Sequence, residues 1–249
     1  MSPVTVLILL LATFVTAMIS GVFGMAGGLI LRGVLALILP VSAAMVVHGA
    51  IQSVSNGWRA VILRQWISWR ILLIYLAGSG TAAALLIWFT FELDKAWLFI
   101  VLGLVPGIIW IPRQWIHLDA AKPHHAVACG FTVTGLNVVA GVSGPLLDVF
   151  FAETETDRRA IVATKAATQV ISHAVKIGYY ILPALAAGAL PAPHWLLLAA
   201  PLAVLGTTLG TRVLNLMSDI QFRQWTKWIV SVIGLVYIVR GVLLLTGAS

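Results

Sequence analysis

The sequence predicts an all-α integral membrane protein made of two inverted repeats. Of its 249 residues, 61% are hydrophobic and only 9% are charged, and the mean hydropathy is +1.04. These values exclude an ordinary soluble domain. Apolar runs of about 20 residues recur along the chain, the length that crosses ~30 Å of hydrocarbon. The prediction of two inverted repeats rests on an internal duplication and on the charges of the loops.

The first half begins with an apolar run, Val4–Ser20, that no Lys or Arg precedes. A signal peptide needs a basic segment before its apolar stretch, so we interpret this run as part of the mature fold. The expected elements that follow are a glycine-rich break at Gly21–Gly28, a short run at Leu29–Leu39 ended by Pro40, and helices at Ser42–Leu63, Ile71–Phe91 and Ala96–Ile111.

The second half repeats this plan, so we divide one membrane domain into a first repeat, 1–118, and a second repeat, 119–249. Its expected elements are Ala126–Ala140, a break at Gly141–Pro145, a short run at Leu146–Ala152, and helices at Arg159–Leu182, Trp195–Leu214 and Phe222–Leu245. The two short runs cannot cross a bilayer alone. We therefore expect each glycine-broken segment to form a re-entrant segment or a hairpin, followed by three transmembrane helices.

A polar stripe on an otherwise apolar helix occurs twice, 117 residues apart. At 100° per residue, each stripe occupies an arc of about 100° on one helix face. Such a face is expected to lie against protein or water, not lipid. The first stripe is His48, Gln52, Ser55, Asn56 and Arg59, and the second is Lys165, Gln169, Ser172, His173 and Lys176. Gly24 and Gly27 recur as Gly141 and Gly144 at the same spacing, which supports a duplication.

The loop charges predict that the repeats are inverted. Cytoplasmic loops are enriched in Lys and Arg, whereas the loops Glu92–Lys95 and Pro183–Trp195 carry one cation and none. We expect those two loops and both termini outside, with the stripe helices running in opposite directions. The cations that place the other loops inside are Arg64, Arg70, Arg113, Lys122, Arg212, Arg223 and Lys227.

Inversion would bring the two stripes together near the middle of the membrane, where transporters bind their substrates. Helices that start after Gly27 or Gly144 would direct backbone N–H groups and a positive dipole end at an anion. Arg32, Arg59, Lys165 and Lys176 lie in membrane segments against one acid, Asp148. A cavity with these groups is expected to favour anions.

Other interpretations of these residues exist. The polar side chains could be interhelical hydrogen-bond partners, and Arg59 and Lys176 could extend to the membrane surface. Ser143 in Gly141-Val-Ser-Gly144, with His173 on the next long helix, resembles the serine and histidine pair of intramembrane rhomboid proteases. The first repeat has Ala26 in place of the serine, which argues for shared backbone geometry instead of a hydrolase.

The excess of seven positive charges is explained by the loop cations, so we expect no nucleic-acid partner. The sequence contains no nucleotide-binding loop and no cluster with metal-ligand spacing. We therefore expect no cofactor, no metal and no built-in ATPase.

The sequence resembles the sulfite exporter TauE/SafE family of membrane permeases. The resemblance rests on Gly21-Val-Phe-Gly24-Met-Ala-Gly27-Gly28, on Gly141-Val-Ser-Gly144-Pro145, on Ala163-Thr164 at the start of the second stripe helix, and on the duplicated layout. It implies transport of a small sulfur-containing anion such as sulfite, a sulfonate like sulfoacetate, or thiosulfate. It also implies a multi-pass protein of the inner membrane.

The sequence thus predicts a secondary transporter with a small anion and the lipid bilayer as its partners. The amides and hydroxyls of Gln52, Ser55, Asn56, Gln169, Ser172 and His173 would bind the anion, with charge from Lys165 and His48 and backbone donors from Gly27, Gly28 and Gly144. Protonation of His48, His173 or Asp148 could couple transport to a proton gradient. The alternatives are an anion channel, an exporter of another metabolite anion and, more remotely, the serine hydrolase.

Overall fold

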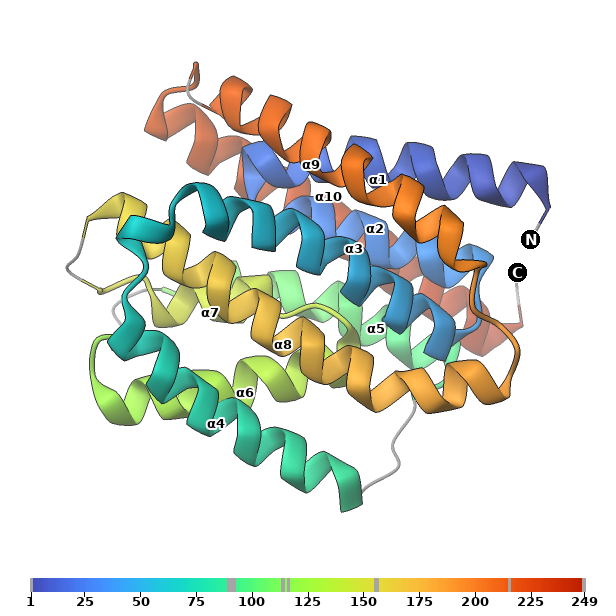
Figure 1. The fold of residues 1–249 in the computed structure, drawn as a ribbon, viewed down its shortest axis with the longest axis horizontal. Coiled ribbons are helices and arrows are strands. Elements are labelled where there is room, and N and C mark those ends of the chain that lie inside the picture. Colours follow the sequence, from blue (N-terminus) through green and yellow to red (C-terminus); the bar gives the residue numbers. More distant parts are fainter. Residues whose placement is uncertain are drawn as a thin grey trace.

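The computed structural model describes residues 2–88, 93–112, 115, 117–154, 157–214 and 216–247, and within these ranges every regular element is helical (Figure 1). The α-helices are α1 (Pro3–Phe23), α2 (Met25–Ile38), α3 (Val41–Ile62), α4 (Trp69–Trp88), α5 (Lys95–Leu104), α6 (Pro123–Ala140), α7 (Gly144–Phe150), α8 (Arg158–Ala186), α9 (Pro193–Leu214) and α10 (Asp219–Thr246). Two 3₁₀ turns, η1 (Arg64–Trp66) and η2 (Val105–Trp110), complete the described elements.

The order of helices agrees with the sequence prediction. By length and composition, α1, α4, α9 and residues Gln224–Thr246 of α10 could each cross a membrane. The stripe helices α3 and α8 are also long enough, at 22 and 29 residues. The chain is therefore an all-α, multi-pass membrane protein.

The helix breaks are caused by single glycines in a conformation that other residues rarely adopt. Gly24, between α1 and α2, has φ of 61° and ψ of −102°, and Gly141, after α6, has φ of 88°. A side chain with a Cβ is strained at both values. The first break is narrower than the predicted Gly21–Gly28, since Gly21 belongs to α1 while Gly27 and Gly28 lie inside α2.

Four helix pairs build the bundle, namely α1 with α9, α4 with α6, α3 with α8, and α5 with α10. Three of these pairs approach closely at glycines. A Cβ on Gly210 would lie 2.1 Å from the Met18 carbonyl oxygen of α1, and one on Gly78 would lie 2.0 Å from that of Val127 in α6. Gly103 and Gly234 similarly face each other between α5 and α10. Small residues permit this close backbone packing in a membrane, where burial from water does not drive helix association.

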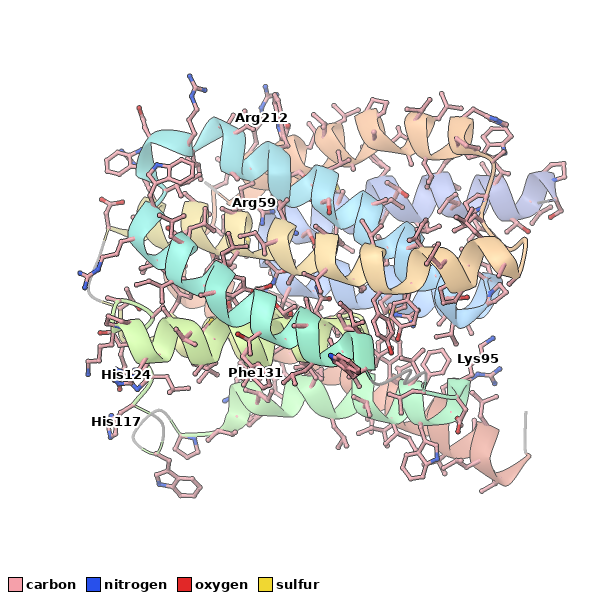
Figure 2. All side chains as sticks on the ribbon, turned by 60° about the horizontal axis from the view of Figure 1, so that its bottom comes forward. Arg59, Lys95, His117, His124, Phe131 and Arg212 are labelled. Atoms are coloured by element: carbon pink, nitrogen blue, oxygen red, sulfur yellow. The ribbon has the colours of Figure 1, made fainter. Side chains whose placement is uncertain are left out.

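Figure 1 shows that α3 and α8 run antiparallel and that the two termini lie at the same end of the bundle. Lys95, from a loop predicted to be outside, lies at the opposite end from His117 and His124, which belong to the predicted cytoplasmic linker (Figure 2). These two segments therefore lie at opposite ends of the bundle, and which end faces the cytoplasm stays a prediction. Of the residues used for that prediction, Glu92 and Arg113 lie outside the described ranges, as does Phe91, the predicted end of a helix.

Most helix boundaries differ from the prediction by a few residues, and two of the differences involve a proline. Helix α8 continues through Pro183 to Ala186, four residues beyond the predicted end. The predicted helix Ala96–Ile111 changes to 3₁₀ geometry at Val105. Pro106 has no N–H for the carbonyl four residues earlier, which favours the change at this point.

Candidate functional site

The candidate site is a cavity of about 530 Å³ between the two stripe helices and the two glycine breaks. Its wall includes Ile62 and Leu63 at the end of α3, Leu214 at the end of α9 and Phe222 near the start of α10. Ile62 is half exposed, so the cavity reaches the surface at this end of the bundle. Polar residues of both stripes line it, namely His48, Gln52, Asn56, Arg59, Lys165, Gln169 and His173.

The closed end of the cavity is a hydrogen-bonded cluster, which we call the floor, formed by His48, Lys176, Asn137 and His173. Lys176 is 0% exposed, and its ammonium group lies 2.8 Å from His48 Nδ1, 2.8 Å from the Gly141 carbonyl oxygen and 3.2 Å from Asn137 Oδ1. Three acceptors satisfy the three N–H donors of a lysine. The floor therefore joins α3, α6 and α8 around one buried cation.

Lys176 also determines which nitrogen of His48 carries a proton. Because the ammonium group can only donate, His48 Nδ1 accepts, and Nε2 then donates to the Gly28 carbonyl oxygen at 3.0 Å. Both ring nitrogens of His48 are thus occupied by the protein. In this conformation His48 is a wall of the site and has no free N–H for an anion.

His173 is placed differently, although its ring lies edge-to-face with that of His48 at 5.6 Å. The Asn137 amide nitrogen donates to Ser172 Oγ at 2.9 Å and lies 3.1 Å from His173 Nδ1. An amide N–H₂ only donates, so Nδ1 accepts and Nε2 carries the proton. That Nε2 is buried and has no hydrogen-bond partner among the described residues, and His173 lines the cavity. A buried N–H donor without a protein partner is uncommon.

The amides between the floor and the open end are less constrained. Gln52 accepts a long 3.5 Å contact from Asn56 Nδ2, and Gln169 lines the wall opposite. Nearer the open end, Lys165 is ion-paired with Asp148, and these side chains are 28% and 38% exposed. The single acid of the site thus neutralises one of its cations.

Arg59 and Lys176, which correspond in the two repeats, perform corresponding tasks. Arg59 donates to the Ser20 carbonyl oxygen at the end of α1 at 3.0 Å, as Lys176 does to that of Gly141 after α6. Both bind a carbonyl group beside a helix break, and the Ser20 carbonyl also accepts the Gly24 N–H at 2.9 Å. Both cations suit a helix C-terminus. Figure 2 shows Arg59 inside the bundle, whereas Arg212 points outward. The interpretation of Lys176 as a side chain that extends to the membrane surface is wrong, because it is fully buried.

Several other predicted site residues are engaged elsewhere. Ser55 bonds Thr207 on α9 at 2.7 Å, and Ser172 donates to the Gln169 carbonyl oxygen at 3.1 Å. A Cβ on Gly27 would meet the Thr16 carbonyl oxygen at 2.0 Å, so this glycine permits the packing of α2 on α1. Gly28, Ser143 and Gly144 do line the cavity.

The pairing of Ser143 with His173 is not formed, because neither Ser143 Oγ nor His173 Nε2 has a hydrogen-bond partner. The Asn137 amide keeps the proton on Nε2, and a protonated nitrogen cannot accept a proton from a serine hydroxyl. Among the described residues, no group of three or more His, Cys, Asp or Glu side chains is placed to hold a metal ion.

Sequence reasoning did not include Asn137 among the site residues. A signal was present, since Asn137 stands 117 residues after Ser20, and both are polar residues near the end of the helix that precedes a break. Arg32 was noted only for its charge. The structure places it beside Gly141, where a Cβ on that glycine would lie 2.5 Å from Arg32 Nε.

The duplicated polar cavity can be compared with known proteins. A protein-family model described as "Sulfite exporter TauE/SafE" matches residues 9–237, which include both glycine breaks, both stripes and eight of the ten α-helices completely. No curated protein and no solved structure matches the chain. Since the match covers nearly all of the sequence, the chain belongs to the sulfite exporter TauE/SafE family.

Proposed function

We propose that this protein is a secondary transporter of the cytoplasmic membrane that exchanges a small sulfur-containing oxyanion between the two sides by alternating access. The observation that carries the proposal is the cavity between the stripes, which is open at one end and closed by the floor at the other. The family indicates sulfur anions. Sulfite, an organosulfonate such as sulfoacetate, and thiosulfate are the candidates.

The helix contacts support an inverted-repeat architecture. The sequence repeat pairs α1 with α6, α3 with α8, α4 with α9, and α5 with α10. With this correspondence, the contact between α1 and α9 has its counterpart in the contact between α6 and α4. The other two pairs, α3 with α8 and α5 with α10, each join corresponding helices. Gly103 and Gly234 correspond at a spacing of 131 residues, which also relates Trp97 to Trp228, and they contact each other directly. These relations are those of a two-fold axis, and antiparallel stripe helices favour an axis in the membrane plane.

The same correspondence suggests how access alternates. His48 and Lys176 meet at the closed end, and their counterparts, Lys165 and Arg59, line the cavity nearer the open end. If each repeat adopted the arrangement now seen in the other, His48 and Lys176 would separate and the floor would open. Lys165 and Arg59 would then come together at the other end of the cavity. Two cations repel each other at short range, and an anion between them removes that cost. Closure of the open end is therefore favoured when an anion is bound.

The polar groups of the cavity are suited to an oxyanion. His173 Nε2 is a buried donor without a partner, and Gln52 and Gln169 offer amide donors on both sides of it. Donors of this kind match oxygens that accept several hydrogen bonds. Lys165 is ion-paired with Asp148. It becomes available to a substrate when Asp148 is protonated.

A channel is less well supported than a transporter, because the floor and the apolar residues behind it close one end. Met45 and Tyr180 behind the floor are both buried. A serine hydrolase is disfavoured by the donor state of His173 Nε2. An exporter of another metabolite anion is distinguished by the substrate test below.

Transport of labelled anions by the purified protein in proteoliposomes tests this function. We expect saturable uptake of at least one of sulfite, sulfoacetate and thiosulfate, with acetate as the control anion, and stimulation by a pH gradient. Non-saturating flux that is independent of the gradient would indicate a channel. The absence of flux for every sulfur anion, with an active control transporter in the same vesicles, would refute the proposal.

A further inference from the structure

Arg32 on α2 is a fully buried cation that the proposed site does not use. Its side chain is 0% exposed, and Nε, Nη1 and Nη2 all lack a hydrogen-bond partner within the part of the chain that the structure describes. A guanidinium carries five N–H donors. An unpaired buried charge is costly and requires a specific explanation.

Arg32 lies directly behind the floor. It stands one helical turn after Gly28, whose carbonyl oxygen binds His48, and it is absent from the cavity wall. Gly141 lies between it and Lys176, since Lys176 binds the Gly141 carbonyl oxygen and a Cβ at Gly141 would be 2.5 Å from Arg32 Nε. Two buried cations therefore converge on one helix break.

The other charges of the interior do not compensate this pair. Asp148, the acid of the cavity, is paired with Lys165. His48 and His173 are both neutral by the hydrogen bonds that they make. Burying an uncompensated cation destabilises a fold, so the position of Arg32 is explained by a negative charge that arrives from outside the chain.

We propose that Arg32 is a second binding group for the transported oxyanion, reached when the floor opens. The inference rests on the transport function proposed above and adds the residue that receives the anion on the far side of the floor. The planar fork of a guanidinium can bind two oxygens of a sulfite or sulfonate group at once, which a lysine cannot. Lys176 supplies a neighbouring positive charge for the same group.

The proposal has an unusual consequence for stability. A residue kept for structure loses stability when it is replaced, whereas a buried cation without partners gains or keeps stability when an apolar side chain of similar size replaces it. Arg32→Met is therefore expected to leave the apparent Tm in detergent unchanged or higher. Lys176→Met, which removes three hydrogen bonds, is the contrasting variant and is expected to lower it.

The experiment measures the apparent Tm of each purified full-length variant with increasing sulfite, sulfoacetate or thiosulfate, with chloride at equal ionic strength as the control. A ligand that binds the folded state raises Tm with its concentration. We expect a sulfur anion to stabilise the wild type, and we expect Arg32→Met and Arg32→Gln to need at least tenfold more of it. Arg32→Lys should be intermediate, because it keeps the charge and loses the fork. Arg64→Gln, at an exposed loop residue, should behave as wild type.

Three other outcomes would each overturn a proposal. Equal anion stabilisation of wild type and Arg32→Gln would overturn the inference while leaving the transport function intact. Failure of both Arg32→Met and Arg32→Gln to fold would show that Arg32 has a structural role, which also overturns it. If no sulfur anion stabilises the wild type or is transported by it, the proposed function itself fails.

Discussion

The ammonium nitrogen of Lys176 lies 2.8 Å from Nδ1 of His48, so the last residue of one polar stripe meets the first residue of the other. The two residues are 128 positions apart in the sequence. They meet because α3 and α8 pack antiparallel (Figure 1). The cation of one repeat thereby determines the tautomer of the imidazole of the other. A movement of the two halves that opens the floor must break this hydrogen bond.

The two glutamines provide a test of the binding site. Gln52→Ala and Gln169→Ala should each reduce the rate of anion transport at least tenfold, because each removes amide donors from the cavity wall. The amount of folded protein should change much less. Gln65→Ala, at an exposed glutamine in the loop after α3, is the matched control. Wild-type transport by both cavity variants would leave these glutamines with a packing role only.

The glycine breaks allow a test of backbone geometry. Gly24→Ala should destabilise the protein by about 1–2 kcal/mol because of its positive φ alone, since a Cβ there meets nothing within 4 Å. Gly141→Ala should cost more, because its Cβ would also meet Arg32. Unfolding in detergent, followed by circular dichroism, measures both.

Gly80→Ala is the control for the two glycine variants. Gly80 lies inside α4 with nothing within 4 Å of its Cβ position, so alanine there should be neutral or stabilising by roughly 0.5–1 kcal/mol. A loss of stability at Gly80 equal to that at Gly24 would contradict the backbone explanation.

Asp148→Asn tests the coupling to protons. The carboxylate competes with an anion for Lys165, and asparagine imitates the protonated acid. We expect a lower KM for the anion and loss of the stimulation by a pH gradient, measured in proteoliposomes. Because the pair is partly exposed, the change in stability should remain below about 1 kcal/mol. Unaltered stimulation by the gradient would assign the coupling to another group.

The orientation in the membrane is tested by cysteine labelling. Cys129 is the chain's single cysteine and is buried, so Cys129→Ser provides a background without thiols. A cysteine introduced at Gln65 should react with an impermeant reagent only from the cytoplasmic side, and one at Gly188 only from outside. Reversed labelling would refute the prediction that both termini are outside, and a cytoplasmic reporter fused after Ser249 would do so independently.

Most of the fold could be predicted because its signals are local. Apolar runs, Pro40 and the glycine breaks placed all ten α-helices, with errors confined to their ends. Those errors have local causes as well. Pro183 did not end α8, and only Gly24 of the first glycine-rich segment adopts a conformation that interrupts a helix.

The sequence predicted which residues come together, but not which groups each of them contacts. Periodicity put each stripe on one face of its helix, and in the structure seven of the ten stripe residues line the same cavity. Periodicity could not show that Ser55 bonds Thr207 on α9, that Ser172 bonds Asn137 on α6, or that His48 has no free nitrogen. Which partner a polar side chain finds depends on the neighbouring helix, and helical periodicity contains no information about that neighbour.

The sequence by itself determined that this is an all-helical membrane protein of the sulfite exporter TauE/SafE family, and it predicts a duplication, because hydropathy, glycine positions and repeat spacing are properties of the chain alone. Only the tertiary structure decided which cations are neutralised and which are not. Lys165 pairs with Asp148, Lys176 binds three acceptors, and Arg32 has no hydrogen-bond partner in the part of the chain that the structure describes. The physical reason is that the compensation of a buried charge depends on atoms within a few ångströms, and helix packing brings those atoms from distant parts of the sequence.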